Sequence, residues 1–111
     1  LQQHDDLAMV QTRNGGIDIQ VSRGTEAVAI FDGVVSKVFV VPGYHNSIII
    51  RHGNYLTVYA NLQNVSVQAG QKVKTGQVLG TVASDDEGQY GVMQFQVWHE
   101  RNKLNPQAWI R

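Results

Sequence analysis

The feature that most constrains the fold of this chain is the grouping of its apolar residues into short runs. These runs are rich in Val, Ile, Tyr and Phe, they are separated by Gly, Asn and Asp, and no stretch shows a long helical period. β-branched and aromatic residues suit the pleated, half-buried surface of a sheet. The pattern therefore predicts an all-β domain with strands at 17–21, 27–31, 33–41, 47–51, 55–60, 77–82 and 92–99.

Residues that favour tight turns lie between these runs. Gly, Asn and Asp supply the backbone angles that turns need, so we expect turns at 31–33, 42–43, 52–54 and 85–88. The segment 52–54 joins two strand-like runs and predicts a hairpin. A single helical turn is expected near 61–64. We divide the chain into a lead-in at 1–13 and one domain at 14–111.

Length and charge limit the possible classes of protein. A chain of 111 residues forms one domain, and its 9 basic and 9 acidic residues balance. Duplex-binding proteins usually carry a basic face, so no nucleic-acid partner is expected. No apolar run approaches the roughly 18 residues of a membrane span. The chain has no cysteine and opens at Leu1, which favours a domain cut from a longer precursor with its targeting signal upstream.

Two stretches of the chain, 24–35 and 69–80, share one pattern. In both, a glycine turn leads into a short strand, then a second glycine, then another apolar strand. This pattern resembles the half-motif of barrel-sandwich hybrid folds, which include biotinyl and lipoyl carrier domains as well as LytM domains. Carrier domains present a modifiable lysine within Met-Lys-Met or Asp-Lys-Ala. Neither motif surrounds any of the lysines of this chain, which are Lys37, Lys72, Lys74 and Lys103.

Further segments narrow the resemblance. They read Asn-Gly-Gly-Ile-Asp at 14–18, Thr-Val-Tyr-Ala-Asn-Leu at 57–62 and Val-Met-Gln-Phe-Gln-Val-Trp at 92–98. Together with 73–80 they resemble the LytM or lysostaphin-like zinc peptidases of peptidoglycan, whose motifs are His-x-Gly-x-Asp, Tyr-x-His-Leu and His-x-His-Phe. The resemblance implies a two-layer antiparallel barrel-sandwich hybrid with a groove on one face. Four positions of the family's histidines are occupied here by Asn14, Asn61, Val92 and Gln94.

This substitution pattern argues against metal-assisted hydrolysis. In the family, the zinc ligands correspond to Asn14, Asp18 and Gln94, and the two other histidines correspond to Asn61 and Val92. Zinc prefers imidazole, thiolate or carboxylate ligands, whereas a neutral amide oxygen is a poor one. A valine side chain cannot transfer a proton. We therefore expect no enzyme activity, no bound metal and no cofactor.

Each polar residue also has an ordinary interpretation. Asn14 suits a turn, Asp18 suits a solvent-facing strand position, and the two glutamines suit the wet face of an edge strand. Taken together, they indicate a recognition groove. The period of two places Val92, Gln94, Gln96 and Trp98 on one face, and Thr57, Tyr59 and Asn61 on one face. The predicted degenerate site or partner groove consists of Asn14, Asp18, Tyr59, Asn61, Val92, Gln94, Gln96 and Trp98.

The ending Asn-Pro-Gln-Ala-Trp at 105–109 resembles the EnvC-type murein hydrolase activators. That resemblance implies a periplasmic regulator at the cell envelope, with an upstream coiled coil. Its partner is an N-acetylmuramoyl-L-alanine amidase, one helix of which docks in the groove during septum splitting and cell division. Two alternatives stay open: a peptidoglycan-binding module, and a residual zinc endopeptidase that uses Asp18. The four histidines are isolated from one another, and we expect His52 to be structural.

Overall fold

The computed structural model describes residues 10–13, 16–85, 87–99 and 102–104. This part of the chain is built from strands and contains no helix long and apolar enough to cross a membrane. The strands are β1 (Val10–Arg13), β2 (Gly16–Ser22), β3 (Glu26–Val28), β4 (Gly33–Val40), β5 (Asn46–His52), β6 (Tyr55–Gln63), β7 (Lys72–Val73), β8 (Val78–Val82), β9 (Tyr90–His99) and β10 (Asn102–Leu104).

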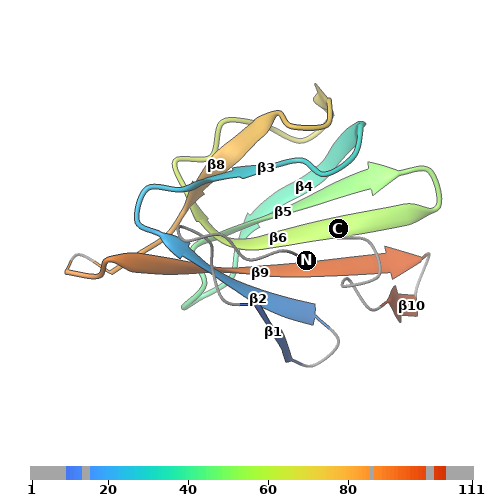
Figure 1. Cartoon of the computed structure of the whole chain (residues 1–111). Coiled ribbons are helices and arrows are strands. Elements are labelled where there is room, and N and C mark those ends of the chain that lie inside the picture. Colours follow the sequence, from blue (N-terminus) through green and yellow to red (C-terminus); the bar gives the residue numbers. More distant parts are fainter. Residues whose placement is uncertain (1–9, 14–15, 86, 100–101, 105–111) are drawn as a thin grey trace.

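The main sheet runs in the order β1-β2-β9-β6-β5-β4-β7, and its pairs are antiparallel (Figure 1). β10 pairs with β9, and β8 pairs with β3 and with the end of β6. In Figure 1, β3 and β8 lie apart from the lower strands of the main sheet and form a second layer. The all-β, antiparallel fold expected from the sequence is confirmed.

The hairpin expected at 52–54 joins β5 to β6. His52 pairs with Tyr55, so Gly53 and Asn54 form a two-residue loop. Gly53 has φ +68° at the first central position, where a type II′ turn requires a positive φ. This turn fixes the register of β5 against β6.

The two similar stretches at 24–35 and 69–80 pair with each other. β3 pairs with β8 and β4 pairs with β7, so the first strand of each stretch meets the second strand of the other. The Val82 amide donates to the Thr25 carbonyl at 2.9 Å, and the Val35 amide donates to the Gln71 carbonyl at 2.8 Å. The repeated pattern therefore corresponds to two interlocked halves of one fold.

The core fills the space between the two layers. Its largest fully buried side chains come from β2, β4, β5, β6, β8 and β9, and they include Ile17, Ile48, Tyr59, Leu79 and Phe95. Alternate residues of the main sheet point away from this core. We call the surface that they form the outer face.

Several details of the prediction are wrong. The helical turn expected near 61–64 does not form, because β6 continues to Gln63 and bonds to β8. The strand expected at 27–31 ends at Val28. β1, β7 and β10 were not expected, and all three are short strands of two to four residues that give little periodic signal. The boundary between lead-in and domain at residue 13 stays a prediction.

Candidate functional site

The pairing of β2 with β9 brings Asp18 opposite Gln94 on the outer face. Burial along β9 follows the predicted period of two: Phe95 and Val97 are each 1% exposed, whereas Gln94 and Gln96 are half-buried. The alternation expected for β9 is therefore confirmed. It places a carboxylate and two amides on neighbouring strands.

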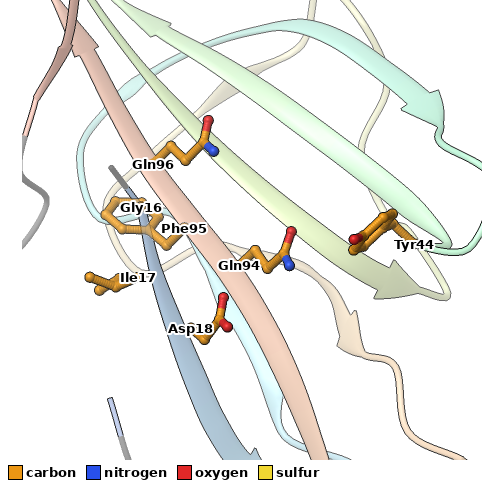
Figure 2. A pocket seen from close by; sticks show the side chains of 7 residues that line it. All are labelled: Gly16, Ile17, Asp18, Tyr44, Gln94, Phe95 and Gln96. Atoms are coloured by element: carbon orange, nitrogen blue, oxygen red, sulfur yellow. The ribbon is translucent and has the colours of Figure 1, made fainter. Parts of the chain in front are cut away.

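A pocket of about 260 Å³ opens beside these side chains. Figure 2 shows that the amides of Gln94 and Gln96 project from β9 toward the same side, with the Asp18 carboxylate on the neighbouring strand. We call this cavity the amide pocket. Its lining residues are Gly16, Ile17, Asp18, Tyr44, Gln94, Phe95 and Gln96.

Tyr44 lines the amide pocket from the connection between β4 and β5, and the sequence did not predict it. The turn around it is held by the Tyr44 amide, which donates to the Val41 carbonyl at 2.8 Å. Gly43 (φ +87°) and His45 (φ +53°) both have left-handed backbone angles. The Tyr44 side chain is 45% exposed. No periodic signal marks a turn residue as part of a site, and only the folded loop brings this ring across from Gln94 (Figure 2).

The Gln96 amide is held by Trp98 on the same strand. The Trp98 indole Nε1 donates to Gln96 Oε1 at 3.0 Å. Gly16 lets β2 lie close to this side chain, because a Cβ at Gly16 would lie 2.9 Å from Gln96 Cγ and 3.1 Å from the Phe95 carbonyl oxygen. Two contacts thus fix one wall of the amide pocket.

The positions Asn61 and Val92 lie next to each other. The Asn61 amide Nδ2 donates to the Val92 carbonyl at 2.7 Å, and the Ala83 amide donates to the Asn61 carbonyl at 2.9 Å. Asn61 has φ +72°, a left-handed angle that Asn tolerates better than most residues. Val92 is 39% exposed. Asn61 therefore supports the backbone where β6 leaves β9 and turns toward β8.

The prediction that Tyr59 faces the groove is wrong. Its side chain is 1% exposed, and its ring lies 5.3 Å from that of Phe95 in the core. The Ile30 amide donates to the Tyr59 hydroxyl at 3.2 Å. Burial raises the pKa of Tyr59, against the opposing effect of hydrogen bonds from Thr57 and Ile30. The expected shared face of Tyr59 and Asn61 does not exist, because the backbone irregularity at Asn61 interrupts the period of two, as the burial of Leu62 shows.

His52 and His99 make contacts away from the amide pocket. His52 Nδ1 donates to the Asp32 carbonyl at 2.6 Å, and its Nε2 lies 2.8 Å from Thr57 Oγ1. His99 stacks on Tyr55, with ring centroids 4.6 Å apart. The structural role expected for His52 agrees with these contacts. Asn14 lies outside the described residues.

The amide pocket does not fit zinc. It offers one carboxylate and two neutral amides, whereas zinc sites are built from imidazole, thiolate and carboxylate ligands. No three His, Asp or Glu residues among those that the structure describes form a group suited to a metal ion. The donors can instead bind polar groups, since each amide both donates and accepts hydrogen bonds and a carboxylate accepts them.

Comparison with known proteins matches residues 12–106 to the model of Peptidase family M23. The chain is 35% identical over 99 residues to the murein hydrolase activator NlpD of Salmonella dublin, covering 87% of the chain and 26% of that protein. It is 28% identical over 111 residues to the murein hydrolase activator EnvC of Escherichia coli, covering 99% of the chain and 26% of that protein.

Solved structures share the fold. A putative M23 peptidase from Pseudomonas aeruginosa superposes with a TM-score of 0.81 at 23% identity, covering 93% of this chain and 47% of that one.

The uncharacterized lipoprotein YgeR of Escherichia coli is a further sequence relative, 36% identical over 101 residues, which cover 87% of the chain. The chain spans 14% of the length of one curated relative and 39% of the length of YgeR.

Proposed function

The chain belongs to peptidase family M23, and from that premise we propose that it is a non-catalytic member that binds and activates a cell-wall amidase. The observation that carries the proposal is the donor set of the amide pocket. Asp18 stands beside Gln94, and the family resemblance places zinc ligands at both positions, but Gln94 offers only a neutral amide. Asn61 and Val92 occupy the positions of the two other histidines that hydrolysis would need. Relatives named murein hydrolase activators support the same conclusion.

The proposed partner is an N-acetylmuramoyl-L-alanine amidase that acts during septum splitting and cell division. One of its helices docks on the outer face, with the amide pocket at one end of the docking surface. An activator must bind the active conformation of its partner more tightly than the inactive one, because only a difference in affinity shifts the equilibrium. The proposed location is the periplasm or cell envelope, where peptidoglycan, the substrate of the amidase, is found. The relatives of this chain include a lipoprotein.

The test uses the purified chain and the purified amidases of its source organism. Binding is measured by biolayer interferometry, and activation by dye release from labelled sacculi. We expect the chain to raise amidase activity by about tenfold and to release no dye alone. Gln94→Ala, in the amide pocket, should reduce both signals. Gln89→Ala removes the same group from an exposed position outside the pocket and should leave both signals unchanged.

Other outcomes favour the alternatives. Binding to sacculi that free stem peptides compete away, without binding to an amidase, would favour a peptidoglycan-binding module. Zinc-dependent cleavage by the chain alone, abolished in Asp18→Ala, would favour a residual endopeptidase. Either result would overturn the activator proposal.

A further inference from the structure

A second feature of the outer face is a group of exposed cations far from the amide pocket. We call Lys37, Arg51 and Lys72 the basic corner. They come from β4, β5 and β7, which are neighbours in the main sheet (Figure 1). All three side chains are exposed. Because the chain has no net charge, this clustering is a local segregation of charge.

The registers place the basic corner on the same face as the amide pocket. Directly opposed residues of neighbouring strands share a face. One cross-strand row runs Lys72, Val34, Arg51, Leu56 and Trp98, and the next runs Lys37, Ile49, Val58 and Gln96. Residues that alternate with them, such as Val35, Ile50 and Val97, are buried in the core.

Apolar side chains connect the two polar regions. Ile49, Val58 and Leu56 are half-buried on the outer face, and Val34 is 39% exposed beside Arg51 and Lys72. The strands β9, β6, β5 and β4 are spaced by about 4.8 Å, so Gln96 and Lys37 are separated by roughly 14 Å across the sheet. A helix of about ten residues, at 1.5 Å per residue, spans this distance.

The charges of the basic corner are not neutralised by the described residues. Asp18, at the opposite side of the sheet, is the only described acidic residue in a register position on this face. Asp32, in the turn before β4, accepts hydrogen bonds from the amide and the hydroxyl of Thr75 at 2.7 and 3.0 Å. Lys37 Nζ lies 5.2 Å from the centroid of the Phe39 ring, a contact that positions the ammonium without cancelling its charge.

We propose that the basic corner binds acidic side chains of the protein segment that docks on the outer face, which gives that segment a direction. This inference rests on the proposed function. Asp or Glu residues at one end of the docked segment pair with Lys37, Arg51 and Lys72, and apolar residues pack on Ile49, Val58 and Leu56. At the other end, polar groups of the segment reach the amide pocket.

A protein segment fits this surface better than a membrane does. Three cations on a half-apolar sheet face are few for stable adsorption to anionic lipid, which usually needs a larger basic cluster. A lipid surface also leaves the amide pocket unused. Acidic side chains opposite the basic corner steer the encounter and set the orientation, which is the usual effect of charge at the rim of an interface.

The test compares four single variants that each remove one positive charge: Lys37→Gln, Arg51→Gln, Lys72→Gln, and the control Lys74→Gln. Lys74 is exposed in the loop after β7 and lies outside the two cross-strand rows. Affinity for the amidase is measured at 50 and 300 mM NaCl. We expect each corner variant to bind about two- to fivefold more weakly at low salt, and the control to match the wild type.

The salt dependence gives a second readout. Wild-type binding should weaken as salt rises, because screening shortens the reach of the charges. The triple variant K37Q/R51Q/K72Q should show a smaller salt effect. Thermal melting of each variant separates these effects from loss of folding.

Each contrary outcome has a distinct meaning. If the wild type binds no amidase, the proposed function and this inference both fail. If it binds and the corner variants behave like Lys74→Gln, only the basic corner is overturned. Weakened binding of the triple variant to phosphatidylglycerol vesicles or to sacculi, with amidase binding unchanged, would assign the corner to those ligands and would also overturn the inference.

Discussion

At the scale of single residues, the backbone angle of Asn61 explains more of the site than its side chain chemistry. Its left-handed φ ends the pairing of β6 with β9, and its amide bonds to the Val92 carbonyl across the gap. The same local change takes Asn61 off the buried face that Thr57 and Tyr59 share, and Leu62 fills the core in its place. Conformation and hydrogen bonding can be separated by substitution.

We expect Asn61→Ala to lower the free energy of unfolding by about 2 kcal/mol, because it loses a hydrogen bond and strains the left-handed angle. Asn61→Gly loses the bond but accepts the angle, so we expect about 1 kcal/mol. Asn64→Ala is the control for strain alone, since Asn64 also has a positive φ, of +52°. Urea unfolding measures all three. Equal losses for the Ala and Gly variants at position 61 would contradict this account.

At the scale of elements, the turn before β4 is tied to the turn that follows β7. Asp32 accepts two hydrogen bonds from Thr75, and these bonds lower the pKa of Asp32, with smaller help from the charges of Lys74 and His52. The Gly76 amide donates to the Ala29 carbonyl nearby at 2.7 Å. This link joins the ends of the two interlocked halves.

The lowered pKa of Asp32 predicts a dependence of stability on pH. The unfolded state releases its proton near the ordinary value of 3.8, and the folded state releases it below that value. The stabilisation is therefore complete above about pH 4 and is lost as the pH falls through the folded-state pKa. We expect the melting temperature of the wild type to fall more steeply than that of Asp32→Asn between pH 4 and pH 2. Parallel pH profiles would show that the Thr75 bonds do not favour the ionised carboxylate.

At the scale of the whole molecule, the chain keeps the two-layer sheet of its family, and the proposed function gives its outer face a role in recognition. The amide pocket and the basic corner lie on opposite sides of one continuous surface. A ligand that binds only the folded state raises the melting temperature. The melting temperature therefore tests directly whether the chain binds zinc.

We expect a saturating concentration of zinc to leave the melting temperature of the wild type unchanged relative to EDTA, because the donors of the amide pocket do not fit zinc. The variant N14H/Q94H supplies, with Asp18, the ligand set that the family resemblance implies. It serves as the positive control and should be stabilised by zinc. Stabilisation of the wild type that Asp18→Ala removes would show that the native residues hold the metal.

The sequence by itself determined the positions of most of the longer strands and the alternation along β9. Both follow from local periodicity, since a strand with one buried face must alternate. It also supported the family resemblance through motifs that lie within single segments. Asp18 and Gln94 could be predicted as one site only because the family places those positions together.

Only the tertiary structure decided which residues share a surface. Thr57 and Tyr59 face the core by regular alternation, whereas the left-handed Asn61 leaves that face, and no pattern in the sequence marks the break. Tyr44 joined the amide pocket through the fold of a loop. The basic corner unites residues from three strands that are distant in sequence, because cross-strand register, set by turns and core packing, determines which side chains become neighbours.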